Sequence, residues 1–276
     1  MGSQVDIAVP AEARSGQAPT WDVGTDTLLW TDAPAHTAHR YVPGQADHVM
    51  GLPQQVGAAK PRSRGGLVLH LAEGIALYDA GGEQRTWLVY WARDGVRAGA
   101  TTIDRRGRLW ATTLGAGGWL ARVTSDGSAN IAVPDLVAGH GIGWSPDDTR
   151  MYLSDGAARR IDVLDFDLAA GTADNRRALC DVDGEPGGLC VDNAGRIWVA
   201  VRDRGEIRCY TAEGELARTI PLPARRPTDC CFGGPDLTDL YVTTARDAVP
   251  DPTEADGALL ILRNTGTGNR PFAFTG

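Results

Sequence analysis

The sequence is poor in lysine. Lys60 is the single lysine among 27 basic residues, which face 35 acidic residues and leave a formal net charge of −8. Proteins that bind nucleic acid or an anionic membrane surface usually present a basic field. The charge balance therefore argues against both kinds of partner, and we interpret the scarcity of lysine as a bias of genomic composition.

Long apolar runs are also missing, because no segment approaches the roughly 18 residues of a membrane span. The opening residues 1–16 have neither a basic start nor an apolar stretch, so we expect no signal peptide. The five cysteines are odd in number and form no C-x-x-C or zinc-like spacing. These features predict a cytoplasmic protein whose reduced thiols pack as small apolar groups.

Glycine, in contrast, is abundant. The chain has 35 glycines in 276 residues, spread along its length without a collagen-like period. Glycine supplies the positive φ angles of tight turns, and many turns indicate many short strands. With 42% hydrophobic residues, the chain can also build a substantial core.

A phrase recurs along the chain, consisting of an apolar strand, a turn with Asp or Gly, and a second strand. Its six copies lie at 18–33, 56–73, 99–115, 141–156, 187–203 and 229–246. Aligned on the apolar residue before the turn, they place in register Trp21, Lys60, Ile103, Trp144, Val191 and Phe232, at intervals of 39, 43, 41, 47 and 41 residues. Two more alternating segments follow each copy, as at 159–167 and 176–182. Four short strands in about 42 residues are typical of a propeller blade.

The repeats predict an all-β protein, a six-bladed β-propeller with four antiparallel strands per blade, in one domain over residues 1–276. The N-terminal segment 5–10 is left over, and we expect it to close the last blade as its outer strand, which removes an exposed edge. The Pro- and Asp-rich segment 245–257 is expected to be a surface loop near one mouth of the channel.

Several of these phrases resemble a known family. They include GRLWATTLG (107–115), GIGWSPDDTRMYLSD (141–155), GLCVDNAGRIWVA (188–200) and CCFGGPDLTDLYVTTAR (230–246), of which the last is the most specific. The chain resembles the gluconolactonase, regucalcin (senescence marker protein) and luciferin-regenerating enzyme family over all six blades. That resemblance implies a divalent cation at the top of the channel, where it activates water against a sugar lactone or a related ester.

The resemblance also implies four metal ligands, and this sequence has changed all of them. The family's Glu, Asn, Asn and Asp correspond here to Gln17, Gly99, His140 and Gly187. A hard cation needs several oxygen ligands, usually including carboxylates. We therefore expect the family metal site to be lost and the protein to need no cofactor. The alternative is a site rebuilt for calcium or zinc from His140, Gln17 and Asp229.

Three side chains are the candidates for catalysis. His140, between two glycines at the channel mouth, has an imidazole suited to acid–base work, although it could simply cap its strand. Asp229 places a carboxylate where the resemblance implies a small hydroxyl; it could hold the His140 ring, or bond local backbone amides. Arg97 matches the family's substrate-contacting arginine, with a surface arginine as the alternative.

Other residues are expected to complete the pocket. The predicted substrate-binding residues are Gln17, Thr228, Gly187, Gly99 and His70, the last because it ends a strand that could reach a channel mouth. Lys60 could form a Schiff base if buried, but a one-residue shift of its blade would leave it at an edge. His39 and His48 are expected on the surface.

Three hypotheses for the function follow. The first is a metal-independent enzyme derived from a lactone hydrolase, in which His140-centred acid–base chemistry acts on a lactone, ester or carbonyl substrate of specialised metabolism. Its reaction is a hydrolysis, or else a cyclisation, dehydration or isomerisation. The second is a metal-dependent sugar lactonase with the rebuilt site, and the third is a non-catalytic ligand-binding propeller. Each has a small molecule as its partner; substrate identity and oligomeric state stay open.

Overall fold

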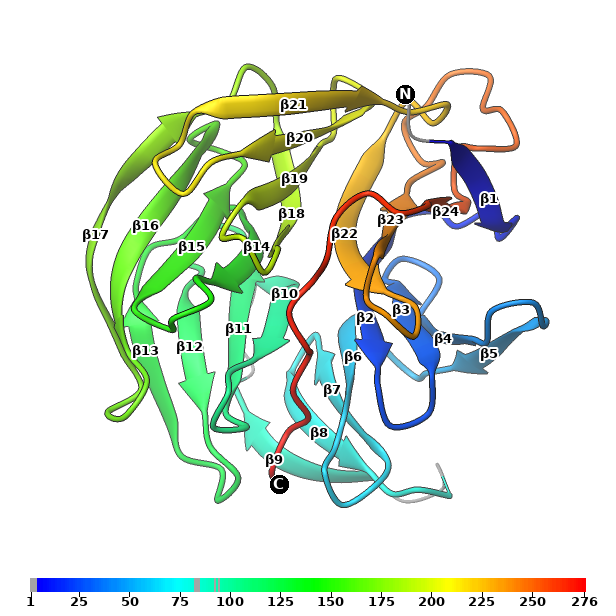
Figure 1. The fold of residues 1–276 in the computed structure, drawn as a ribbon. Coiled ribbons are helices and arrows are strands. Elements are labelled where there is room, and N and C mark those ends of the chain that lie inside the picture. Colours follow the sequence, from blue (N-terminus) through cyan, green and yellow to red (C-terminus); the bar gives the residue numbers. More distant parts are fainter. Residues whose placement is uncertain (1–3, 82–84, 92, 94) are drawn as a thin grey trace.

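The computed structural model describes residues 4–81, 85–91, 93 and 95–276. Its 24 strands form six four-stranded antiparallel sheets that surround a central channel (Figure 1). The described residues contain no helix that could span a membrane. The fold is a six-bladed β-propeller, as predicted.

The first three blades follow each other along the chain, and in each the first strand is innermost. Blade one contains β2 (Gly16–Asp22), β3 (Thr27–Asp32), β4 (Thr37–Tyr41) and β5 (Asp47–Gly51). Blade two contains β6 (Val56–Pro61), β7 (Leu67–Leu71), β8 (Gly74–Tyr78) and β9 (Arg85–Tyr90). Blade three contains β10 (Arg97–Ile103), β11 (Leu109–Leu114), β12 (Leu120–Val123) and β13 (Ala129–Val133).

The next three blades complete the ring. Blade four contains β14 (Gly139–Trp144), β15 (Arg150–Asp155), β16 (Arg160–Asp167) and β17 (Thr172–Asp181). Blade five contains β18 (Pro186–Val191), β19 (Ile197–Val201), β20 (Glu206–Tyr210) and β21 (Leu216–Pro221). Blade six contains β22 (Pro227–Gly233), β23 (Asp239–Thr244), β24 (Leu259–Leu262) and the N-terminal strand β1 (Val5–Val9).

Strand β1 closes the ring. It pairs antiparallel with β24, with Val5 opposite Leu262 and Ile7 opposite Leu260. The last blade therefore joins the two ends of the chain and leaves β24 without a free edge, which confirms the prediction for the leftover N-terminal segment.

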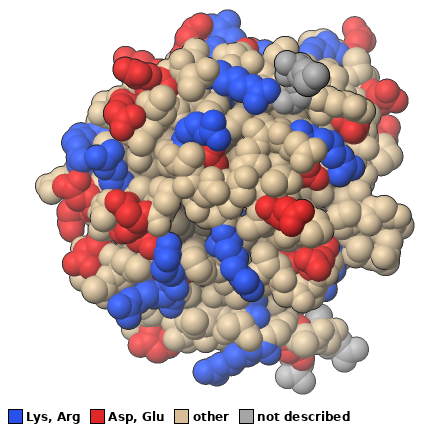
Figure 2. Space-filling model, in the orientation of Figure 1, with Lys and Arg blue, Asp and Glu red and all other residues tan. Residues whose placement is uncertain are grey.

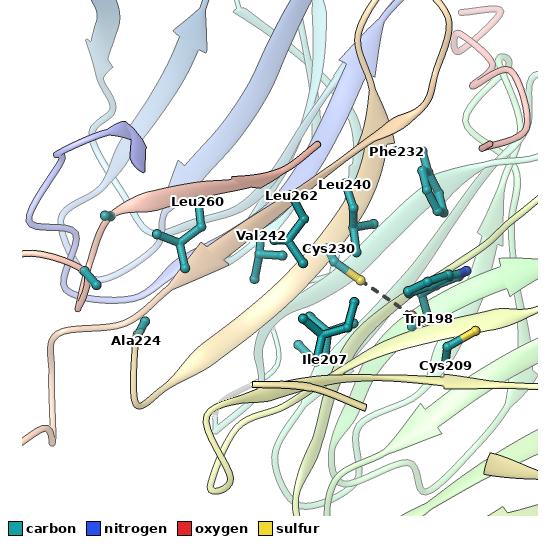
Figure 3. Packing of buried hydrophobic residues seen from close by; sticks show 14 residues of the cluster. Trp198, Ile207, Cys209, Ala224, Cys230, Phe232, Leu240, Val242, Leu260 and Leu262 are labelled. Atoms are coloured by element: carbon teal, nitrogen blue, oxygen red, sulfur yellow. Dashed lines mark hydrogen bonds between the residues drawn. The ribbon is translucent and has the colours of Figure 1, made fainter. Parts of the chain in front are cut away.

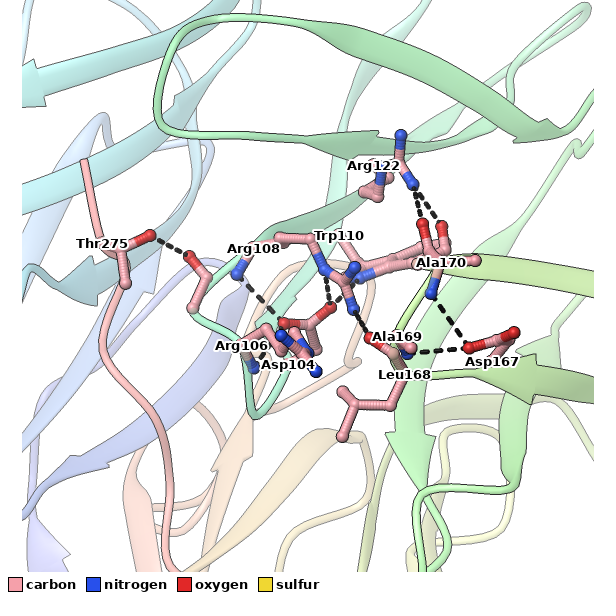
Figure 4. Close-up of polar contacts among 12 residues, drawn as sticks. Asp104, Arg106, Arg108, Trp110, Arg122, Asp167, Leu168, Ala169, Ala170 and Thr275 are labelled. Atoms are coloured by element: carbon pink, nitrogen blue, oxygen red, sulfur yellow. Dashed lines mark hydrogen bonds and ion pairs between the residues drawn. The ribbon is translucent and has the colours of Figure 1, made fainter.

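A buried aspartate fixes the hairpin turn of blade three. The carboxylate of Asp104 accepts hydrogen bonds from the backbone N–H groups of Arg106 and Arg108, from Arg108 Nε at 2.6 Å and from Trp110 Nε1 at 2.9 Å (Figure 4). Blade five repeats the arrangement around Asp192, which is completely buried. The shared phrase D-x-x-G-R-x-W thus encodes one turn, whose acid satisfies donors that would otherwise be buried without partners.

The hydrophobic cores lie between neighbouring blades. Figure 3 shows the cluster between blades five and six, where Trp198 meets Phe232 edge to face with ring centroids 5.8 Å apart. Cys230 lies in the same cluster and its thiol donates to the Trp198 carbonyl oxygen at 3.5 Å. All five cysteines are free, and two of them, Cys209 and Cys230, are fully buried in this core.

One histidine was placed wrongly by the sequence. His39, expected on the surface, is 8% exposed, lies against the Trp30 ring and has Nδ1 at 2.6 Å from Asp47 Oδ2. The residues that cover it, Trp30 of β3 and Asp47 of β5, come from the strands on either side of β4. His48, on the outer strand β5, is exposed as expected.

The last 13 residues, 264–276, form a segment that we call the C-terminal strap. It leaves blade six and crosses the end of the channel toward blades two and three (Figure 1). Phe274 is fully buried against these blades, and its backbone exchanges hydrogen bonds with Pro61 and Ser63. On the strap side of the molecule, acidic and basic side chains are interspersed (Figure 2).

Candidate active site

Every inner strand is irregular close to the end at which it starts. The register shifts between Gln17 and Thr20 in β2, and between Gly139 and Gly141 in β14, with comparable shifts in the other four inner strands. Bulges of this kind re-aim side chains and are common next to active sites. The positions that the family resemblance marked as metal ligands lie within or beside these bulges, at the end of the channel that we call the mouth.

The channel holds two spaces. A small one of about 30 Å³ lies at the mouth and is lined by Gln17, Gly99, Arg202 and others. The second, of about 450 Å³, which we call the chamber, is lined by inner-strand residues and by strap residues 269–272. His140 and Asp229 line both spaces. A chamber of this size is large enough for a small-molecule ligand.

Lys60 projects into the channel. Its blade is indeed shifted by one residue, because Pro61 pairs with Leu67 in the way that Ile103 pairs with Leu109. The consequence is the opposite of the one expected: Lys60 does not lie at an edge but is only 5% exposed and lines the chamber beside Thr20. Its ammonium group donates to the Thr20 hydroxyl and, at 3.4 Å, to the carbonyl oxygen of Ala18.

Asp229 lies next to this lysine. Its Oδ2 accepts the Ala18 N–H at 3.1 Å and its Oδ1 accepts the Cys230 N–H at 2.7 Å. Gly188, on the neighbouring inner strand, makes room for the carboxylate, because a Cβ there would collide with it. Burial raises the pKa of Asp229 to about 7, and the charge of Lys60 opposes this rise. Burial likewise lowers the pKa of Lys60 to about 8, against the opposing effect of Asp229.

His140 lies at the mouth, on the bulge of β14, with its ring close against Gly156. Its Nε2 is 3.5 Å from Nη1 of Arg202, which extends from the end of β19. Burial lowers the pKa of His140 to about 3, and the charges of Arg202 and Arg97 act in the same direction. The imidazole is therefore neutral near pH 7. No hydrogen bond between His140 and Asp229 exists among the described residues.

The other predicted mouth residues are arranged as follows. Arg97 is exposed at the first residue of β10. Gln17 donates its amide to the Gly57 carbonyl oxygen at 3.0 Å. Thr228 bonds the Gly16 carbonyl oxygen and the hydroxyl of Thr243.

Two predicted pocket glycines serve close packing in this structure. A Cβ on Gly99 would lie 2.6 Å from Thr112 Oγ1, and one on Gly187 would collide with the Thr228 carbonyl oxygen. Gly99 lines the mouth, whereas Gly187 does not line either space. Glycine at these positions therefore lets neighbouring strands approach each other.

His70 is not at a channel mouth. It is fully buried, with Nδ1 at 2.8 Å from Thr101 Oγ1 and its ring edge-on to Trp91. Burial lowers its pKa to about 3, so the ring is neutral. His70 contacts blade three and lines neither of the two spaces, which fits a structural role rather than the predicted contact with substrate.

The donor set at the mouth does not fit the family's hard cation. Gln17 offers a neutral amide and no carboxylate, Asp229 is compensated by Lys60, and His140 faces the guanidinium of Arg202. Within the described part of the chain, no three His, Cys, Asp or Glu side chains gather as a metal site would require. The positively charged side chain of Arg202 lies beside His140, one of the positions where the resemblance implied a metal ligand.

The sequence did not predict Arg202 as a site residue. It did include Lys60 as a candidate, but placed it at an edge and not facing the chamber. Arg202 lies 62 residues after His140 and reaches it from the neighbouring blade, so no local pattern connects them. For Lys60, the neighbouring Pro61 could have corrected the prediction. In blade two, Pro61 is the residue equivalent to Ile103 of blade three, so Lys60 comes one residue before that position.

Comparison with known proteins identifies the class. Residues 15–246 match the SMP-30/Gluconolactonase/LRE-like region. The chain therefore belongs to this family of six-bladed propellers, as the sequence motifs indicated.

The relatives narrow the assignment further. A 6-deoxy-6-sulfogluconolactonase from Pseudomonas putida is 32% identical over 90% of this chain and 89% of its own. Regucalcin from Xenopus laevis is 28% identical over 99% of both chains. A luciferin-regenerating enzyme superposes with a TM-score of 0.93 over all of both chains at 25% identity. A calcium-binding regucalcin from Agrobacterium tumefaciens has the same fold, with a TM-score of 0.94, 22% identity and coverage of 99% and 98% of the two chains. The protein is a gluconolactonase- and regucalcin-like propeller, and a lactonase-like enzyme.

Proposed function

We propose that the protein opens a small lactone or a related ester where the chamber borders the mouth, without a bound metal, with Asp229 as the group that transfers the proton. The single observation that carries this proposal is the position of Asp229 between mouth and chamber, beside Lys60, with a pKa of about 7. A general base works best when its pKa lies near the working pH. His140, with a pKa of about 3, is a weaker base, so we assign it the role of a neutral hydrogen-bonding group.

The reaction follows from this arrangement. A water molecule held by the Asp229 carboxylate attacks the carbonyl carbon of the lactone and gives its proton to Asp229 as the new C–O bond forms. The carbonyl oxygen becomes an oxyanion, whose charge the Arg202 guanidinium stabilises. When the oxyanion collapses, the ring C–O bond breaks and the leaving oxygen takes the proton from Asp229. The products are a hydroxy acid and the original carboxylate.

The family supports the choice of substrate class. The Pseudomonas putida relative is by name a lactonase of a sulfonated sugar, and most of its length matches this chain. A sugar lactone is accordingly the first substrate to test.

The decisive experiment measures lactone hydrolysis by the wild type and by Asp229→Asn. We expect kcat to fall by about 10²–10⁴-fold when the base is lost. Asp236→Asn is the matched control, since it is the same change at an exposed loop residue of the same blade. An Asp229→Asn protein that is folded and fully active would overturn the proposal.

The position of Lys60 favours a second candidate function, the formation of an imine with a carbonyl substrate. As a chamber-lining amine with a pKa of about 8, it could condense with a carbonyl substrate to an imine and release water. Because it is the only lysine, borohydride reduction of an imine would add mass to the one tryptic peptide that contains Lys60. Labelling of Lys60 by a carbonyl compound, with no lactone hydrolysis, would favour this function over the first.

A further inference from the structure

The two spaces of the channel differ in what they can hold. The mouth, of about 30 Å³, has room for about one water molecule, whereas the chamber, of about 450 Å³, is in the size range of small-molecule sites. Asp229 lines both spaces. A lactone that reacts at Asp229 therefore has to place most of its atoms in the chamber, so the chamber wall selects the substrate.

Most of the chamber wall is apolar. Five of the cores between neighbouring blades each contribute to it an apolar side chain that is at most 6% exposed, namely Trp21, Ile103, Ile142, Leu189 and Phe232. The cores thus extend to the channel and surround the chamber with what we call the apolar belt.

Two half-buried thiols, those of Cys190 and Cys231, belong to the same wall. Burial raises the pKa of each thiol well above its ordinary value, so both stay uncharged near pH 7. An uncharged thiol behaves as a small apolar group. The apolar belt is therefore not interrupted at these two positions.

The polar side chains of the wall are largely engaged with other protein groups. Thr101 Oγ1 lies 2.8 Å from the ring of a buried histidine in blade two, and Arg105 Nε lies 2.5 Å from Asp148 Oδ2. The exceptions are Arg270, which is exposed, and Thr102, whose hydroxyl forms no hydrogen bond with any described residue. A sugar lactone carries hydroxyl groups around its ring, and burying them without partners is costly. The chamber is better suited to a substrate with few polar groups.

The strap completes the wall at the end of the chamber away from the mouth. Asn269 donates its side-chain amide to two backbone carbonyl oxygens of blade five, at 3.2 Å each. At the other end of the strap, Arg62 Nε donates to the Gly276 carbonyl oxygen at 2.7 Å. The strap is therefore fixed on both sides of the channel, and Pro271 and Phe272 line the chamber between these two points.

We propose that the substrate is a lactone or ester with an apolar chain or ring, and that this apolar part lies in the chamber and extends from Asp229 toward Phe272. The inference rests on the proposed function for the place of the reacting carbonyl, and it names the substrate class. Each methylene group that passes from water into an apolar site strengthens binding by about fourfold. Chain length is therefore the property of the substrate to vary.

The test measures hydrolysis of lactones that share one ring, namely δ-valerolactone, δ-hexalactone, δ-octalactone and δ-decalactone, whose side chains grow from none to pentyl. We expect kcat/KM of the wild type to rise by about fourfold per added methylene until the chain fills the chamber. D-Glucono-δ-lactone has the same ring with hydroxyl groups in place of the chain. Its kcat/KM should be at least about 100-fold lower than that of δ-decalactone.

Variants at Thr102 examine the wall itself. Thr102 is the blade-three equivalent of Lys60 and lines the chamber, so Thr102→Phe narrows the space. This change should lower kcat/KM for δ-decalactone at least about tenfold more than for δ-valerolactone. Thr102→Val removes the hydroxyl and keeps the shape, so the dependence on chain length should persist. Thr219→Phe, the same change at an exposed residue of the outer strand β21, is the matched control. If Thr102→Phe does not fold, Phe272→Ala on the strap should reduce the gain for the longest chain.

A binding measurement separates this inference from the reaction. Calorimetry with the hydroxy acids that δ-decalactone and δ-valerolactone yield on ring opening needs no turnover. Tighter binding of the longer acid that is weakened in Thr102→Phe supports the apolar site even if no lactone is hydrolysed. Hydrolysis at rates that do not depend on chain length, or a preference for D-glucono-δ-lactone, overturns the inference while the proposed function stands.

Discussion

Lys60 and Asp229 both form hydrogen bonds with the backbone of the same residue, Ala18. The Asp229 carboxylate accepts the Ala18 N–H at 3.1 Å, and the Lys60 ammonium donates to the Ala18 carbonyl oxygen at 3.4 Å. Ala18 has a φ of +53°, in the left-handed region that non-glycine residues seldom adopt. The bulge in β2 therefore presents a donor and an acceptor from one residue to two charges of opposite sign. Blades one, two and six are held together at this point.

The pH dependence of catalysis should report on this pair. If Asp229 is the base, kcat/KM of lactone hydrolysis rises with pH through an apparent pKa of about 7. Replacing Lys60 by Met removes the positive charge that lowers the pKa of Asp229, so the rising limb should move upward by about one pH unit or more. A profile of Lys60→Met that coincides with wild type would contradict the coupling.

The same pair should make stability depend on pH. The folded-state pKa of Asp229 is raised from 3.8 to about 7, so its contribution is present below pH 4 and is lost as the pH rises toward 7. Relative to Asp229→Asn, the wild type should lose up to about 1.4 kcal/mol of unfolding free energy per pH unit in that window. Urea unfolding at pH 4, 5.5 and 7 measures the difference. Parallel pH dependences of the two proteins would show that Asp229 titrates as an ordinary carboxyl group.

Chelation should leave lactone hydrolysis unchanged. Asp229 is compensated by Lys60, and no three ligand side chains gather among the described residues, so exhaustive dialysis against a chelator is expected to keep kcat/KM within twofold of the untreated enzyme. Loss of activity on dialysis, restored by adding calcium or zinc, would instead favour a rebuilt metal site. A chelator-sensitive relative of the family, treated in parallel, shows that the dialysis works.

The turn aspartates should be critical for stability. Asp192→Ala removes a fully buried carboxylate and leaves Trp198 Nε1 and the Arg196 guanidinium without their acceptor. We expect a loss of about 3–5 kcal/mol in the free energy of unfolding. Asp126→Ala is the control, because Asp126 bonds Thr124 and Ser128 in an exposed turn of blade three and should matter much less. Equal losses in the two variants would refute a special role for burial.

The fold could be predicted from the sequence because each copy of the repeat corresponds to one four-stranded blade. The phrase around Asp104 recurs around Asp192 with the same turn, and the leftover N-terminal segment could only complete the unfinished sixth blade. Local spacing was enough for the first five blades, since each of them is one local unit of four consecutive strands.

The site was less predictable, since it depends on contacts between blades. His140 lines the mouth and stays a predicted site residue, but its pKa is set by burial and by Arg202, which lies one blade away. His70 was expected near substrate because it ends its strand, whereas it is buried against Thr101 of the next blade. The alignment of the repeats placed Lys60 at the last position before the turn, which Pro61 occupies in the structure.

The closure of blade six by β1 also has a consequence for biosynthesis. Its partner β24 begins at Leu259, 254 residues after Val5, so β1 leaves the ribosome long before the strand that pairs with it. At about 5–20 residues per second, β1 waits on the order of 10–50 s for its partner. During translation the nascent chain therefore carries an unpaired β1 while the first five blades are made, and the ring becomes continuous only after β24 has been made.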